Sequence, residues 1–415
     1  MSEGAWPEAA AARGTAAASG GDTLPRMDSR PDFDLAVVGS GAAGLATALG
    51  AAQQGVRVAL IGPRPALRPA TDGFDLRIYA VSPASVRLLD RLGVWQRVPP
   101  ARLQAVSRMR VYSDTGAELD FDAYGAQTER LATIAEESEL VRVLDAACDF
   151  QPAIRRFESN FDALANDARA AVLTLADGTQ VAASLAVGAD GANSALRAAA
   201  GIVNTLKPYG QSGVVANFAC ERAHLGVAWQ WFTHEGIVAL LPLPGDRVSL
   251  VWSAPQALAD QLVTLSPAEL ANRVTVRSGA MLGELASIGP AAAFPLRLMT
   301  VQRLIGARLA LVGDAAHVVH PLAGQGLNLG LQDVAALLDG LAAREPFRDA
   351  GDPVLLRRYE RSRAEPVALM RATTDGLARL FAIESDWAGQ MRGLGFSLVQ
   401  RLGPVKNALI RQALG

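Results

Sequence analysis

Residues 33–62 read FDLAVVGSGAAGLATALGAAQQGVRVALIG: a buried-strand run, a glycine-rich turn, a helical stretch and a second buried-strand run. The turn holds the GxGxxG pattern Gly39-Ser40-Gly41-Ala42-Ala43-Gly44. In such a setting the first glycine makes the tight turn, the second lets the backbone approach a pyrophosphate, and the third lets the helix pack close to the strand. The stretch therefore predicts a β-α-β unit of a dinucleotide-binding fold.

One expected partner of this motif is missing. An acidic residue normally stands about 20 positions after the glycines and binds the ribose hydroxyls, but the sequence there is Ile61-Gly62-Pro63-Arg64. An arginine at this place can favour a 2′-phosphate, which would indicate NADP. Arg64 is thus a candidate cofactor contact, and the motif alone leaves FAD and a nicotinamide cofactor both open.

Length and composition set broad limits. The chain has 415 residues, enough for two or three domains with a cleft between them. Its 39 basic and 41 acidic residues nearly balance, which gives no indication of a nucleic-acid partner. Only Cys148 and Cys220 occur, so neither a zinc site nor a disulfide framework is expected and a cytoplasmic location is predicted. No apolar run reaches the about 18 to 20 residues that cross a bilayer.

The rest of the chain divides by pattern. Residues 1–32, rich in Ala, Gly and Ser, are expected to be a disordered extension, with Met27 as an alternative start. A helix capped by Ser82 is predicted over 81–98, and Asp177-Gly178 predicts a hairpin turn. We predict a discontinuous dinucleotide-binding domain from 33–105, 130–204 and 300–345, an inserted β-rich domain from 106–129 and 205–299, and helices over 346–415.

Two further segments follow strand runs. One is Gly188-Ala189-Asp190-Gly191-Ala192-Asn193-Ser194, with Arg197 shortly after; the other is Leu311-Val312-Gly313-Asp314-Ala315-Ala316-His317, followed by Pro321 and Gly324-Gln325-Gly326-Leu327-Asn328. With the GxGxxG turn they resemble the FAD-dependent aromatic-ring hydroxylases (class A flavoprotein monooxygenases), in which such segments together hold FAD. The resemblance favours FAD and implies an α/β fold: a Rossmann-like FAD-binding domain, an inserted β-sheet substrate domain and a helical C-terminus.

The residue types fit these roles. Asp314 can accept hydrogen bonds from ribose or ribitol hydroxyls, and the family aspartate contacts the ribitol. A helix opening at Gly324-Gln325-Gly326 would favour negative charge on the flavin. Asp75-Leu76-Arg77 resembles the family segment in which an arginine lies near the flavin. Alternatives stay open: Asp190 as a turn residue, Asp314 as a helix cap, Arg77 as a surface ion pair. The candidate FAD contacts are Gly39, Gly41, Ala43, Gly44, Arg64, Arg77, Asp190, Gly313, Asp314, Pro321, Gly324, Gln325, Gly326, Leu327 and Asn328.

A narrower resemblance concerns the middle and end of the chain. It rests on Tyr209-Gly210-Gln211, Trp229 to Phe232, Ala239 to Leu243, Phe294-Pro295-Leu296 and Gln412 to Gly415, which are similar to the ubiquinone-biosynthesis hydroxylases. It implies hydroxylation of the ring of a polyprenylated phenol by dioxygen, through a flavin C(4a)-hydroperoxide. Because no second nucleotide motif is present, the reductant must come from outside, as NAD(P)H or an electron-transfer protein.

The remaining predictions concern individual residues, one terminal segment and alternative functions. The resemblance supplies no catalytic residue, and the aromatic candidates for the substrate pocket are Phe218, Trp231 and Phe232. His317 and His320 stand three apart, but nothing completes a metal site. The stretch from Trp387 is basic and apolar, which indicates either docking on the inner face of the plasma membrane or an amphipathic helix packed on its own domain. Alternative functions are another FAD oxidoreductase of this fold, such as a prenyl reductase or oxidase, and a non-catalytic flavin-binding member of a ubiquinone-biosynthesis complex.

Overall fold

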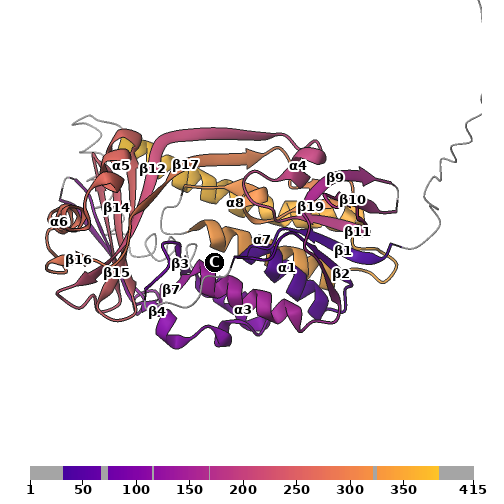
Figure 1. Ribbon diagram of the computed structural model, residues 1–415, viewed down its shortest axis with the longest axis horizontal. Helices are drawn as coiled ribbons and strands as arrows, with labels where there is room; N and C mark the ends of the chain where they lie inside the picture. Colours follow the sequence, from indigo (N-terminus) through magenta and orange to yellow (C-terminus); the bar gives the residue numbers. More distant parts are fainter. Residues whose placement is uncertain (1–30, 67–72, 115, 168, 321–324, 383–415) are drawn as a thin grey trace, which may run out of the picture. The chain divides into compact units, whose positions relative to one another are not determined.

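The computed structural model describes residues 31–66, 73–114, 116–167, 169–320 and 325–382, all within a compact unit that begins at Pro31 (Figure 1). The basic stretch after Trp387 and nearly all of the predicted extension over 1–32 lie outside these residues. Within the described part, no helix combines the length and the apolar character needed to cross a membrane.

An eight-stranded sheet carries the dinucleotide-binding half. Its main path runs β18-β19-β11-β1-β2-β8, with β10 and β9 added at β11. The neighbours β19, β11, β1, β2 and β8 are all parallel. The bounds are β1 (Phe33–Val38), β2 (Val58–Ile61), β8 (Ile154–Phe157), β9 (Phe161–Asn166), β10 (Ala171–Leu175), β11 (Gln180–Gly188), β18 (Ile305–Gly306) and β19 (Leu309–Leu311).

Strands β2 and β19 are apolar along their whole length, and β1 is apolar from Leu35 onward, as expected for strands covered on both faces. Leu35, Val37, Val58 and Leu185 are all fully buried, and Leu45 of α1 joins them in one core. Helix α1 packs against α3 and α7 (Figure 1). The helices of this half are α1 (Ala42–Gln53), α2 (Pro83–Arg91), α3 (Glu137–Asp149), α4 (Ala195–Ala199), α7 (Gln325–Ala342) and α8 (Pro353–Ala382).

A nine-stranded sheet forms the β-rich half, in the order β20-β17-β12-β15-β14-β13-β5-β6, with β16 paired to β12. Helices α5 (Gln256–Thr264) and α6 (Pro267–Arg277) pack on one face. The strands β12 and β17 pair from Asn204 opposite Val301 to Val215 opposite Ala292, and Figure 1 shows them as two long ribbons. The bounds are β5 (Arg108–Tyr112), β6 (Glu118–Asp122), β12 (Asn204–Cys220), β13 (Val227–Thr233), β14 (Gly236–Leu243), β15 (Arg247–Pro255), β16 (Leu285–Ser287), β17 (Ala292–Val301) and β20 (His317–Val318).

A small third sheet lies between the two. It is ordered β3 (Ile78–Val81), β7 (Ala132–Glu136), β4 (Gln104–Val106). Ile78 and Ile134 share a hydrophobic cluster with Ala228 and Leu241 of the nine-stranded sheet. Strand β3 therefore connects the two halves, and Arg77 lies immediately before this strand in the chain.

The structure tests two local predictions, the helix capped by Ser82 and the hairpin turn at Asp177-Gly178. Ser82 caps α2 as predicted, and its hydroxyl accepts from the Ser85 N–H at 3.3 Å. The helix does not reach residue 98 as predicted but ends at Arg91, because Gly93 adopts φ +71°. Residues 95–97 form a separate 3₁₀ turn, η1. The predicted hairpin is confirmed: Gly178, with φ +84°, lies between β10 and β11. A second 3₁₀ turn, η2, spans Pro100–Arg102.

The C-terminal helical region does not stand apart from the first core. Leu356 and Tyr359 of α8 are buried in the same cluster as β1 and α1. The Tyr359 hydroxyl also donates to the Leu311 carbonyl at 2.6 Å. Helix α8 therefore packs as part of the dinucleotide-binding half, and the predicted domain boundaries stay a prediction.

Candidate FAD-binding site

Four neighbouring parallel strands end in one row. Ile61 pairs with Val38, Val38 with Gly188, and Gly188 with Leu311. Each strand runs directly into one of the segments singled out from the sequence. Ligands of open α/β sheets bind outside the carboxyl ends of the strands. The register thus brings segments that lie far apart in the chain to a single edge of the sheet.

Glycines let these segments interlock. A side chain at Gly39, which has φ +118°, would collide with the Ala189 carbonyl of the second segment. At Gly313, with φ +62°, a Cβ would lie 3.2 Å from the Ala43 Cβ. At Gly41, in contrast, it would meet nothing within 4 Å. The first two positions fix the turns against one another, whereas Gly41 leaves the approach to the α1 N-terminus open, where a pyrophosphate would bind.

The third glycine of the motif has the packing role expected of it. A Cβ at Gly44 would collide with the Gly39 carbonyl and would lie 3.3 Å from the Ala189 Cβ. Helix α1 can therefore approach the strands only because this position lacks a side chain.

Two buried oxygens at this edge have no protein partner. They are the hydroxyl of Ser40 and one carboxylate oxygen of Asp190. The other Asp190 oxygen accepts from the Leu196 N–H at 3.1 Å. Asp190 can therefore stabilise the turn with one oxygen and accept a hydrogen bond from a ligand with the other. Buried polar atoms in native proteins almost always have partners. A phosphate of a dinucleotide could accept from the Ser40 hydroxyl, and a ribose hydroxyl could donate to the Asp190 oxygen.

Asp314 follows β19, in the 3₁₀ turn η3 (Gly313–Ala315). Its side chain is accessible to solvent, yet the surrounding protein desolvates it enough to raise its pKa, although His317 and Arg77 oppose that shift. Accessibility together with desolvation places the carboxylate in a recess. A carboxylate in such a place can accept hydrogen bonds from ligand hydroxyls, which is the predicted ribitol contact.

Arg77 lies beside this recess. Its guanidinium donates to Glu137 at 2.9 Å, and the pKa of Arg77 is raised mainly by that carboxylate. The Tyr79 hydroxyl lies 3.3 Å from the other oxygen of Glu137. Glu137 raises and Arg77 lowers the pKa of Asp314 through their charges, so the three charged groups lie near one another. Glu137 belongs to none of the sequence motifs; the signal that could have found it is a charged residue where a buried strand enters a helix.

Arg64 is held by carboxylates. Its Nη1 lies 2.9 Å from Asp149 and its Nε lies 2.7 Å from Glu158. These two acids neutralise the guanidinium and would repel a 2′-phosphate. The hypothesis that Arg64 binds NADP therefore loses its physical basis, and its role as a cofactor contact stays a prediction.

Helix α7 begins at Gln325, and Gly326 and Leu327 lie in its first turn; Pro321 and Gly324 lie outside the described residues. Asn328 is 2% exposed. Its amide donates to the Ala80 carbonyl at 2.8 Å and accepts from the Ser82 N–H at 2.9 Å and the Ser85 hydroxyl at 2.8 Å. The Asn328 side chain thus ties α7 to the start of α2, and the predicted contact of Asn328 with FAD stays a prediction.

The aromatic candidates for a substrate pocket do not converge. Phe218 is fully buried among the residues that α5 and α6 cover, and Trp231 packs on the same face of the sheet, stacked on Tyr112 at 5.9 Å. Phe232 points to the other face, into a cluster with Ile237. Successive residues of a strand alternate between faces. Phe218 is therefore a core residue, Trp231 is partly buried on the same helix-covered face, and Phe232, 5% exposed, packs on the other face. The pocket roles of Trp231 and Phe232 stay predictions.

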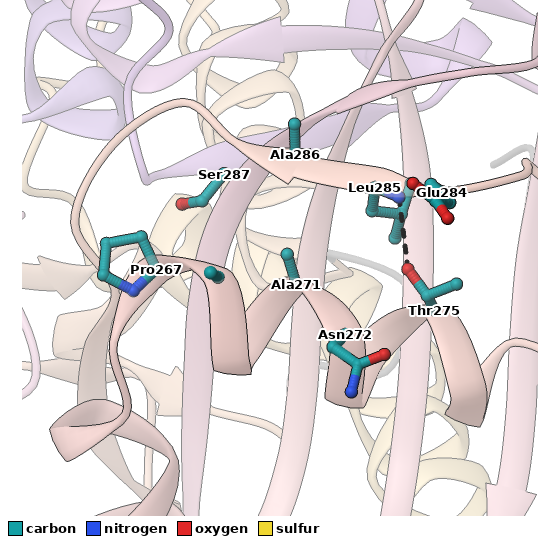
Figure 2. A pocket seen from close by; sticks show the side chains of 9 residues that line it. Pro267, Ala271, Asn272, Thr275, Glu284, Leu285, Ala286 and Ser287 are labelled. Carbon is teal, nitrogen blue, oxygen red and sulfur yellow. Dashed lines mark hydrogen bonds between the residues drawn. The ribbon is translucent and has the colours of Figure 1, made fainter.

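A separate hollow of about 520 Å³ lies between α6 and β16. Figure 2 shows Ala271, Asn272 and Thr275 lining one side and Ala286 and Ser287 the other. The Leu285 N–H donates to the Thr275 hydroxyl at its wall, at 3.2 Å. None of the candidate cofactor or substrate residues lines it. Among the described residues, no group of three or more His, Cys, Asp or Glu side chains is arranged to hold a metal ion.

A family model described as "FAD binding domain" matches residues 32–373. The chain belongs to this FAD-binding family. It is 36% identical over 385 residues to ubiquinone hydroxylase UbiL of Rhodospirillum rubrum, covering 92% of this chain and 89% of that protein. It is 35% identical over 385 residues to 3-demethoxyubiquinol 3-hydroxylase of Escherichia coli, covering 92% and 98%. The solved structure of PqsL from Pseudomonas aeruginosa, 23% identical, superposes with a TM-score of 0.73 over 88% of this chain and 99% of that one, which confirms the fold class.

Membership of the FAD-binding family confirms FAD as the cofactor. The geometry fits a pyrophosphate at the backbone of Gly41, a phosphate oxygen accepting from the Ser40 hydroxyl and a ligand hydroxyl donating to Asp190. Asp314 in its recess and Arg77 beside it would face the ribitol and flavin end. These individual contacts stay predictions.

Proposed function

We propose that this protein is an FAD-dependent monooxygenase that hydroxylates the aromatic ring of a polyprenylated phenol in ubiquinone biosynthesis. The observation that carries the proposal is similarity over 92% of the chain to two proteins named as ubiquinone-pathway hydroxylases. An intact FAD edge, formed by the row from Ile61 to Leu311, supports it.

Bound FAD supplies the activation of dioxygen and the transfer of one oxygen atom to the ring. The chain must bind and orient both partners and exclude water. The turns at Gly39 and Gly313 pack against neighbouring segments, because a side chain would collide with the Ala189 carbonyl at Gly39 and would lie 3.2 Å from the Ala43 Cβ at Gly313. In this proposal Asp314 and Arg77 hold the flavin end of FAD in place, so that the flavin faces the aromatic ring of the substrate from one direction.

We infer that the ring binds on the sheet face that carries Phe232. The opposite face of the nine-stranded sheet is covered by α5 and α6. On the Phe232 side, Ala228 and Leu241 pack against Ile78 of β3, the strand that directly follows Arg77. An apolar face next to the flavin-binding segment suits an aromatic ring with a hydrocarbon tail.

The reductant is proposed to be NAD(P)H or an electron-transfer protein that binds transiently. A cytoplasmic location at the inner face of the membrane and a place in a ubiquinone-biosynthesis complex are proposed with it. The lipid character of the substrate supports these assignments, because a polyprenyl tail partitions into the bilayer.

The test begins with the absorbance spectrum of the purified protein. The gene is then expressed in Escherichia coli strains that each lack one ubiquinone ring hydroxylase, and the quinones are analysed by mass spectrometry. We expect bound oxidised flavin and rescue of one strain, which fixes the ring position. Flavin without rescue of any strain would overturn the substrate and leave the cofactor in place. Asp314→Ala serves as the negative control.

A further inference from the structure

A buried ionic network lies behind the turn that carries Asp314. Its centre is Asp333 of α7, which is 0% exposed. One oxygen of Asp333 accepts from the Gly313 N–H at 3.0 Å and lies 2.6 Å from Nε2 of His317. The other accepts from Nε of Arg363, on α8, at 2.7 Å. His317 and Arg363 are themselves only 4% and 5% exposed.

The two residues bound by one oxygen stand on either side of Asp314. Gly313 precedes it and His317 closes the turn into β20. Hydrogen bonds to a carboxylate are stronger than neutral ones, and burial from water strengthens them further. A single carboxylate oxygen therefore fixes the chain immediately before Asp314 and the side chain three residues after it.

Arg363 completes the arrangement from α8. A buried carboxylate without a cationic partner is strongly unfavourable, and Arg363 places its guanidinium on the oxygen that faces away from the turn. Its Nη2 also reaches the Leu329 carbonyl at 3.4 Å and Gln332 at 3.3 Å, so it is held to α7 as well. The charge of Asp333 is thus maintained by a helix outside the sequence motifs that contact FAD.

We propose that Asp333 is a positioning residue for FAD, acting through Gly313 and His317 to hold Asp314 in the orientation that binds the ribitol. Arg363 supports it from α8. The inference rests on FAD as the cofactor and does not depend on the aromatic substrate, so failure to hydroxylate a phenol leaves it untouched.

The test compares FAD affinity among variants of the full chain, prepared as apoprotein and titrated with FAD by fluorescence quenching. Asp333→Asn keeps the side-chain shape but removes the charge and presents N–H groups toward donors. We expect the FAD dissociation constant to rise about 10- to 100-fold. We also expect a changed visible circular dichroism of the bound flavin, a signal that reports cofactor geometry rather than folding.

Tyr359→Phe is the matched control. It removes another buried hydrogen bond between α8 and β19, from Tyr359 to the Leu311 carbonyl at 2.6 Å, which lies before the turn and is separate from the contacts of Asp333. We expect a lower melting temperature with the FAD dissociation constant unchanged within about twofold. If Asp333→Asn behaves in the same way, Asp333 is only a structural residue and the proposal is wrong.

A second variant covers the case in which Asp333→Asn does not fold. Arg363→Lys retains the charge but loses the planar geometry that matches a carboxylate. Because Arg363 reaches the turn only through Asp333, we expect a rise in the FAD dissociation constant of about threefold or more. Unchanged affinity and unchanged flavin dichroism in this folded variant would overturn the proposal.

Discussion

Arg77 and Glu137 form an ion pair of 2.9 Å beside Asp314, with the Tyr79 hydroxyl on the second carboxylate oxygen. The pair places a positive and a negative charge side by side at the end of the site where the flavin is predicted to lie. If a substitution removes one of the two charges, the remaining charge will therefore shift the reduction potential of the bound flavin directly.

Glu137→Gln is expected to make the flavin easier to reduce. The change removes a negative charge and leaves Arg77 uncompensated, which stabilises the negative charge that reduction places on the flavin. An effect of about 1 kcal/mol corresponds to a rise in the midpoint potential of about 20 mV. The measurement is a reductive titration against a reference dye. Asp339→Asn is the control, because Asp339 is paired with Arg91 near the far end of α7; a fall in potential on Glu137→Gln would contradict the prediction.

Asp314→Asn is expected to stabilise the apoprotein while weakening FAD binding. Desolvation raises the pKa of Asp314 in the folded protein. A carboxyl with a raised folded pKa contributes stability below its unfolded pKa, and that contribution is lost as the pH rises through the folded value. The asparagine has no such loss, so its advantage in melting temperature over the native apoprotein should be larger at pH 7.5 than at pH 4.

The FAD titration of the same variant supplies the other half of the prediction. Loss of a hydrogen bond from a charged acceptor should raise the FAD dissociation constant about tenfold or more. An apoprotein that is less stable than the native one at pH 7.5, or one that binds FAD unchanged, would show that Asp314 is a helix cap rather than a cofactor ligand.

Gly41→Ala and Gly39→Ala should separate cofactor binding from folding. A methyl group at Gly41 meets no protein atom within 4 Å but projects where the pyrophosphate would lie. We therefore expect a stable apoprotein with FAD affinity lowered at least about tenfold. At Gly39 the residue needs φ +118° and the methyl would strike the Ala189 carbonyl, which should cost about 1 to 3 kcal/mol of stability. Urea unfolding and FAD titration of both variants check this; weaker FAD binding by Gly39→Ala with no loss of stability would be evidence against it.

The sequence predicts the strands and turns of this edge well because each motif combines a strand with a glycine or acid at a fixed offset. That combination is local, and it located Gly39, Asp190 and Asp314 correctly on turns after buried strands. What it could not supply is the register that sets Val38 beside Gly188 and Gly188 beside Leu311. That row depends on pairing between strands far apart in the chain.

Side-chain partners were harder to predict for the same reason. Arg64 meets Asp149 and Glu158, which come from the end of α3 and the end of β8. Asn328 stands in a motif, but it meets Ser82 from a distant turn. The sequence around Asp333 does indicate a buried ion pair. An acidic residue in the middle of the apolar run GLNLGLQDVAALL must find a partner if the helix is buried.

The aromatic residues of the β-rich half give the last prediction. Trp231 and Phe232 are consecutive in β13, so alternation already places them on opposite faces; only the structure shows that α5 and α6 cover the face of Phe218 and Trp231. Phe218→Ala should therefore lower stability by about 3 to 5 kcal/mol through a core cavity, with the KM of the folded enzyme for the phenol unchanged. Phe232→Leu should retain most of the stability and raise that KM, by about 5-fold or more if an aromatic contact with the ring is lost. Steady-state kinetics on the substrate that the complementation test identifies, with urea unfolding of both variants, decide the matter. A KM that responds to Phe218→Ala and not to Phe232→Leu would place the ring on the helix-covered face and reverse the assignment of the two faces.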